Sequence, residues 1–286
     1  MSTHSIVGKA GQFNICFRDV TLSSHAGMVL LHDFTQRLGV ATLLDRELQV
    51  KQRERGYRES AAVLALSHNL IMGGSCLLDL KVLRGDVGTQ QLLGLSQVLA
   101  PTTAGEFLRK FELGDIHDLQ RVQRQLQARV RPQQSAACCT LDADSSIYAQ
   151  ASTQKEGSAK TYTGQVGYHP LFVFWYEEAE LVFSHLRRGN AYTSSKIEWS
   201  LKASLKRLPA HLPKKLRADS GFYDRRVVAF CEKRHLTFGI TADQTAPLVQ
   251  AIDALSESHW KNWERQPLMQ VAELRYRPHK WTRAYR

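Results

Sequence analysis

Two aspartates at the ends of expected strands have the residue type and position for metal-dependent chemistry on nucleic acid. Asp144 lies in CCTLDADSS, and Asp219 lies in KLRADSGFY. Because side chains alternate along a strand, Asp142 shares a face with Asp144 and could reach the same cation. Carboxylate oxygens are the ligands that Mg²⁺ and Mn²⁺ prefer, and the cation keeps its other positions for water and substrate phosphate. The pattern therefore indicates part of a divalent metal site.

The same aspartates also have a structural interpretation. Ser220 and Gly221 follow Asp219, and a glycine permits a sharp turn into a following helix that Asp219 could cap. Asp142 and Asp144 could be turn residues at the end of a strand. Composition and spacing alone slightly favour this structural interpretation.

The elements that must position these aspartates are readable from residue 135 onward. Strands are expected where aromatic and branched residues cluster, and helices where apolar residues recur at helical spacing. The order is three strands, a helix, a strand, a helix and a strand: 138–146, 167–176, 180–187, 195–208, 214–219, 224–234 and 236–241. A strand meander followed by two helical crossovers predicts the α/β, RNase H-like fold, a mixed sheet flanked by helices.

The first part of the chain has a different spacing of apolar residues. Residues 27–131 show helical periodicity throughout, which predicts an all-helical N-terminal region ahead of the sheet. We expect a helical region over residues 1–134 and an RNase H-like core over residues 135–286.

Charge points to a polyanionic partner. The chain has 38 Lys and Arg against 27 Asp and Glu, a formal charge of +11, which favours nucleic acid. The segment LRRGNAYTS places Arg187, Arg188 and Asn190 on a loop before a helix, and Lys202 lies on the polar face of that helix. These four are the candidate DNA contacts. His169 is expected to be structural or DNA-facing, because hard Mg²⁺ sites rarely recruit imidazole.

Other classes of protein are disfavoured. The five cysteines form no C-x-x-C pair, so neither a disulfide framework nor a zinc site is indicated. No uninterrupted apolar run reaches the ~18 residues that a membrane span needs, and no signal peptide opens the chain. A cytoplasmic protein without a membrane partner is expected.

Many short motifs together resemble one family. They are GMVLLHDFTQRLG, RGYRESAAVLALSHNLIMGGSCLLDLKVLRGD, LLGL, PTTAGEFLRKF, LDADSS, GYHPLFVF, LRRGNAYTS and RADSGFYD. In this order and spacing the sequence resembles the bacterial insertion-sequence DDE transposases of the transposase DDE domain group 1 type. The resemblance implies DNA cutting and rejoining by Mg²⁺ or Mn²⁺, with Asp144 and Asp219 as the first two catalytic acids and Asp142 beside them. It also implies transposon-end and target DNA as partners, and a homodimer on DNA. In such a protein residues 1–134 would recognise DNA ends, and a strand-rich insertion would begin at about residue 242 of the core.

The chain departs from this family at one point. Family members carry a third acid, a glutamate, on a helix beyond a strand-rich insertion, and this chain ends inside the matching segment. The nearest substitutes are weak: Asp253, Glu257, Glu264 and Glu273. We therefore expect a truncated copy that is inactive alone. A non-catalytic DNA-binding or regulatory remnant is the main alternative, and an RNase H-like nuclease acting on hybrids is a weaker one.

Overall fold

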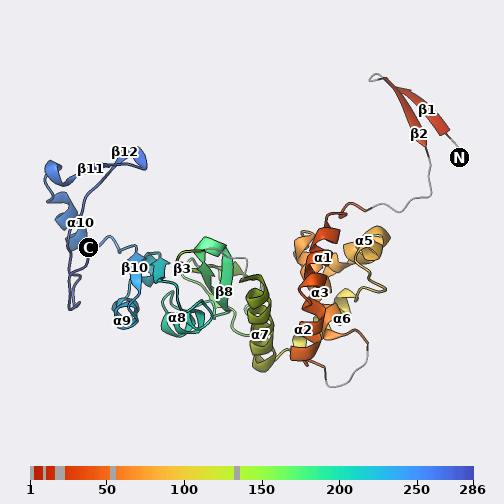
Figure 1. Cartoon of the computed structure of the whole chain (residues 1–286), viewed down its shortest axis with the longest axis horizontal. Coiled ribbons are helices and arrows are strands. Elements are labelled where there is room, and N and C mark those ends of the chain that lie inside the picture. Colours follow the sequence, from red (N-terminus) through yellow and green to blue (C-terminus); the bar gives the residue numbers. More distant parts are fainter. Residues whose placement is uncertain (1–2, 9–10, 17–22, 52–55, 132–135) are drawn as a thin grey trace. The chain divides into compact units, whose positions relative to one another are not determined.

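The chain divides into two units, each with a hydrophobic core of its own. The computed structural model describes residues 3–8, 11–16, 23–51, 56–131 and 136–286 (Figure 1). One unit comprises residues 1–133 and the other residues 134–286. The boundary expected between residues 134 and 135 falls outside the described residues.

The first unit is built mainly from helices. Its core gathers fully buried leucines, among them Leu48, Leu80, Leu83, Leu93 and Leu99. The helices are α1 (Met28–Arg37), α2 (Val40–Glu47), α3 (Glu59–Ile71), α4 (Leu80–Gly85), α5 (Val87–Leu92), α6 (Pro101–Arg109) and α7 (Leu113–Val130). None of the helices in the described part of the chain has the length and apolar character needed to cross a bilayer.

A strand hairpin corrects the expectation of a wholly helical N-terminal region. Strands β1 (Thr3–Gly8) and β2 (Gly11–Cys16) pair antiparallel ahead of the first helix. The helical expectation was derived from periodicity that starts at residue 27, so it carried no information about this earlier segment. The helical description holds for the stretch from α1 to α7.

The second unit contains a five-stranded mixed sheet. In sheet order its strands are β10 (Thr237–Ile240), β9 (Lys214–Ala218), β3 (Cys139–Ser145), β7 (Leu171–Trp175) and β8 (Glu180–His185). Strand β7 is antiparallel to both β3 and β8, whereas β3, β9 and β10 are parallel. This order and these directions define the RNase H-like fold, which confirms the predicted fold class.

Two helices cover one face of the sheet. Helices α8 (Ile197–Leu205) and α9 (Arg225–Lys233) provide the crossovers between β8 and β9 and between β9 and β10. They lie together on one side of the sheet (Figure 1), and Leu201 and Val227 pack in one cluster with Leu141. Burial alternates along β3, where Cys139, Leu141 and Ala143 are buried and the residues between them are not. Thus the face that carries Asp142 and Asp144 is the opposite one.

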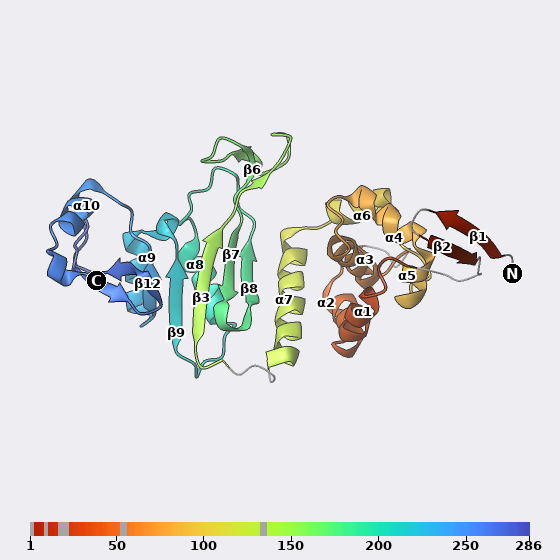
Figure 2. The same cartoon turned by 90° about the horizontal axis from the view of Figure 1, so that it is seen from above.

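Smaller elements extend the core. A three-stranded sheet of β4 (Tyr148–Ala149), β6 (Val166–Tyr168) and β5 (Ala159–Lys160) lies beyond the end of β3 (Figure 2). After β10 come helix α10 (Ala246–Asp253) and the antiparallel pair β11 (Lys261–Trp263) and β12 (Gln266–Val271). The latter pair lies in the segment where a strand-rich insertion was expected.

Candidate functional site

Asp144 and Asp219 lie at the same edge of the sheet. Strands β3 and β9 are parallel neighbours whose last paired residues are Ala143 and Ala218. Asp144 and Asp219 each follow one residue later, and the backbone of Asp219 is still extended (φ −79°, ψ −177°). Since paired residues of adjacent strands project to the same face, the two carboxylates leave the sheet together at its carboxyl edge. Both residues are exposed.

Asp142 has a different environment from Asp144. It is paired in register with Arg217 of β9, whose Nε donates to Oδ1 at 3.0 Å and whose Nη2 donates to Oδ2 at 2.5 Å. The guanidinium also lies 4.2 Å from the centre of the Tyr176 ring. Hydrogen bonding to Asp142 raises the pKa of Arg217 further above its already high value. Both carboxylate oxygens of Asp142 are therefore engaged by one cation.

The bonds of Asp144 and Asp219 are local. Oδ1 of Asp144 accepts from the backbone N–H of Ser145 at 2.7 Å. Oδ1 of Asp219 accepts from the N–H of Gly221 at 3.0 Å, which makes Asp219 the cap of the single turn Ser220–Phe222. The capping interpretation of Asp219 is thus correct in geometry. Neither aspartate forms an ion pair with any described residue, so their hard oxygen donors suit a divalent cation.

Acidic and imidazole groups elsewhere do not join these aspartates. Within the described ranges, no three His, Cys, Asp or Glu side chains come together as a metal-holding group. Asp253 lies on α10 and Glu257 on the following turn, both exposed. Glu273 is ion-paired with Arg286. Among the described residues, no third group therefore joins Asp144 and Asp219 in a metal-holding cluster.

His169 fixes the end of β3 to the loop that follows β8. It is 1% exposed, and its Nδ1 lies 2.9 Å from the carbonyl oxygen of Ala191, which can only accept. Nδ1 therefore carries the proton, and Nε2 accepts from the hydroxyl of Ser145 at 3.0 Å. Sequence reasoning gave His169 no specific partner, because Ser145 and Ala191 are distant in the chain. The hydrogen bond to His169 holds Ser145, the residue next to Asp144, in place.

Arg187 is buried in this same loop. It is 5% exposed and donates to the carbonyl oxygens of His169 at 2.8 Å, Thr193 at 2.7 Å and Ser195 at 3.1 Å. Burial lowers the pKa of Arg187 to about 10. Its guanidinium is turned into the protein, where it organises the backbone. A direct contact with DNA, as the sequence suggested, does not fit this position.

The other candidate DNA contacts are exposed. Arg188 and Asn190 lie on the loop after β8. The backbone of Arg188 forms an isolated antiparallel β-bridge with that of Tyr168 in the small sheet. Lys202 lies on α8 and lines a groove between α8 and α9. The structure thus divides the four predicted contacts among a buried residue, a surface loop and a helix.

Solved structures with some likeness to this chain are DNA transposases. The piggyBac transposase synaptic complex with hairpin DNA is 11% identical, with 84% of this chain and 55% of that chain covered and a TM-score of 0.34. The catalytic domain of Mos1 mariner transposase is 10% identical, with 49% and 74% covered and a TM-score of 0.29. The Mos1 mariner paired-end complex with Mn is 11% identical, with 78% and 73% covered and a TM-score of 0.26.

The extent of these likenesses is limited. The chain spans just over half the length of the piggyBac transposase chain that it matches. No curated protein sequence matches it. The family match is extensive, because residues 7–286 align with the transposase DDE domain group 1. The chain therefore belongs to the group 1 family of transposase DDE domains.

Proposed function

We propose that this chain is the DNA-processing core of a transposase from a bacterial insertion sequence, with Asp144 and Asp219 as its metal-holding acids. The supporting observation is the contrast at the end of β3, where Arg217 engages both oxygens of Asp142 while Asp144 and Asp219 have no ion pair with a described residue. Asp144, and not Asp142, is therefore the proposed first acid. Transposon-end and target DNA are the proposed partners, engaged by a homodimer.

Each residue of the site has a distinct proposed role. Asp144 and Asp219 would hold Mg²⁺ or Mn²⁺, which would supply Lewis-acid activation of a hydroxyl for attack on phosphorus and stabilisation of the leaving oxygen. Ser145 and His169 keep the end of β3 in place beside Asp144. Arg217 neutralises Asp142, so that Asp142 does not compete for the cation.

Metal binding by three matched variants tests this assignment. Asp144→Asn and Asp219→Asn should each weaken Mn²⁺ binding by more than about tenfold, because even groups that only support a ligand contribute 10–100-fold. Asp142→Asn removes an equal charge from the same strand and should change affinity much less. Free Mn²⁺, measured by electron paramagnetic resonance, gives the affinity without any catalytic assay. A dominant effect of Asp142→Asn would overturn the assignment.

A second candidate function rests on the count of carboxylates. Among the described residues no third metal-holding group joins Asp144 and Asp219, which favours a protein that binds DNA and does not complete strand transfer alone. We propose that DNA containing the ends of its own element is bound by the purified chain but not cut in Mg²⁺. Cutting that depends on Asp144 would exclude this candidate. The truncation expected from the sequence stays a prediction, which the encoding DNA beyond Arg286 tests.

A further inference from the structure

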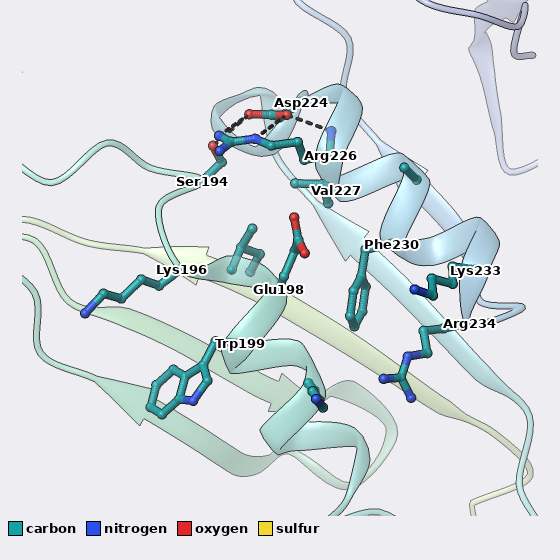
Figure 3. Close-up of a pocket in the computed structure, with 13 residues that line it drawn as sticks. Ser194, Lys196, Glu198, Trp199, Asp224, Arg226, Val227, Phe230, Lys233 and Arg234 are labelled. Carbon is teal, nitrogen blue, oxygen red and sulfur yellow. Dashed lines mark hydrogen bonds and ion pairs between the residues drawn. The ribbon is translucent and has the colours of Figure 1, made fainter.

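A groove separates α8 and α9 on the solvent side of the helix layer. It has a volume of about 660 Å³ (Figure 3). Both helices start at the carboxyl edge of the sheet, because each leads into the amino end of a strand that is parallel to β3. That edge also carries Asp144 and Asp219. The groove therefore begins at the same edge of the sheet as the proposed site and continues away from it along the two helices, on the face opposite to Asp144.

Basic side chains predominate along the groove. They are Lys196, Lys202, Arg226, Lys233 and Arg234, against the two acids Glu198 and Asp224. Asp224 caps the N-terminus of α9: it accepts from the backbone N–H of Arg226 at 2.8 Å and from Nη2 of Arg226 at 2.9 Å. This pairing lowers the pKa of Asp224. The groove is thus positively charged.

Several of these cations are available to a ligand. Lys202, Lys233 and Arg234 are exposed and form no ion pair with any described residue. The floor beneath them is apolar, with Phe230 projecting from α9 toward α8 (Figure 3). Arg226 lies in the first turn of α9, whereas Lys233 and Arg234 lie at its other end. Because Arg226 is paired with Asp224, the unpaired positive charge of α9 lies with Lys233 and Arg234, away from its first turn.

We propose that this groove binds the phosphodiester backbone of the DNA that leaves the carboxylate edge. The idea rests on the proposed function, which brings DNA to that edge. Each nine-residue helix is about 13 Å long, and one strand of a duplex presents a phosphate every ~3.4 Å along the axis. The groove is therefore long enough to contact roughly four consecutive phosphates of one DNA strand. Three exposed cations along the groove, Lys202, Lys233 and Arg234, suit such a repeating polyanion better than a single acidic side chain.

A salt titration of DNA binding tests the groove. The variant Lys202→Gln/Lys233→Gln should reduce the slope of log affinity against log salt by about 1.8, since each lost phosphate contact removes ~0.9. The matched control is Lys206→Gln/Arg225→Gln, which neutralises two exposed cations outside the groove, one directly after α8 and one on α9, and should keep the wild-type slope. Fluorescence anisotropy of a labelled random-sequence duplex measures both, using the full chain in EDTA.

The outcomes separate the groove from the metal site. Equal salt slopes for the groove variant and its control would overturn the proposal. It would also be overturned if the groove variant kept the wild-type DNA slope but lost binding to a polyglutamate peptide, because the groove would then be a site for acidic peptides. Tryptophan fluorescence melts identify any variant that fails to fold, and Lys202→Gln alone, with a slope reduced by about 0.9, then replaces the pair. The salt titration in EDTA does not depend on divalent cations, so it can be interpreted even if the Mn²⁺-binding test of Asp144 and Asp219 fails. The Mn²⁺-binding test likewise does not depend on the groove.

Discussion

At the scale of residues, small differences in environment separate side chains of the same type. Asp142 and Asp144 are two positions apart on one strand and share a face, yet only Asp142 is opposite an arginine in register. This pair is partly exposed, so it adds less than about 1 kcal/mol to stability. Its main consequence is chemical, because a carboxylate with both oxygens bonded to a guanidinium is a poor competitor for a cation.

His68 provides a residue-scale prediction about pH. It is 2% exposed on α3, and among the described residues neither ring nitrogen has a hydrogen-bond partner. Burial, with a smaller contribution from His32, lowers the pKa of His68 below its usual 6.5. The unfolded chain therefore takes up this proton first as pH falls. Stability is fully present above about pH 6.5 and declines below it.

We expect the free energy of unfolding of the first unit to be lower at about pH 5.5 than at about pH 7.5. His68→Leu should reduce this difference, because it removes the titrating group. His117→Gln, at an exposed position of α7, is the control and should preserve the wild-type difference. Denaturant titrations followed by far-UV circular dichroism measure the effect. An unchanged pH dependence in His68→Leu would contradict it.

At the scale of elements, three backbone segments converge at Gly189. A Cβ atom there would lie 2.1 Å from the carbonyl oxygen of Gly167 and 2.4 Å from that of Ala159. The N–H of Gly189 also donates to the carbonyl oxygen of Gly157 at 3.1 Å. A residue without a side chain is therefore required where the loop after β8 meets the small sheet.

Gly189→Ala should destabilise the second unit by about 1–3 kcal/mol, because the loop and the small sheet must move apart. Gly239→Ala is the matched control: it lies on β10 of the same unit, and a Cβ there meets nothing within 4 Å. Thermal melts followed by tryptophan fluorescence compare the two variants. Equal melting temperatures for both would show that the convergence is less tight than this geometry implies.

At the scale of the whole molecule, the two cores make separate contributions to stability. Leu80 is completely buried in the first unit, and Leu201 is completely buried beneath the sheet of the second. All five tryptophans lie between residues 175 and 281, in the second unit. Tryptophan fluorescence therefore reports on one unit, whereas circular dichroism reports on both.

Leu80→Ala should cost the first unit about 2–5 kcal/mol and leave the transition seen by tryptophan fluorescence unchanged. Leu201→Ala is the reciprocal variant and should lower that transition, because it creates a cavity in the core that contains Trp175. Paired melts by circular dichroism and fluorescence distinguish these results. A coincident shift of both signals in both variants would indicate a single cooperative unit.

The order of the elements in the second unit was predictable from the sequence alone. Strand and helix periodicity over residues 138–241 matched the observed sheet and both crossovers, since alternation and helical spacing are local properties. The positions of Asp144 and Asp219 at strand ends followed from the same reasoning. The family followed from many motifs in order, and the match over residues 7–286 agrees with it.

Which side chains meet depends on the folded arrangement of the chain. The pairing of Asp142 with Arg217 depends on the register of two strands, and the burial of Arg187 depends on carbonyl groups gathered by a folded loop. The groove between α8 and α9 depends on how two helices pack on one sheet. None of these could be predicted from the sequence, because each contact joins residues that are far apart along the chain. The direction in which each side chain points is set by the fold and not by the composition.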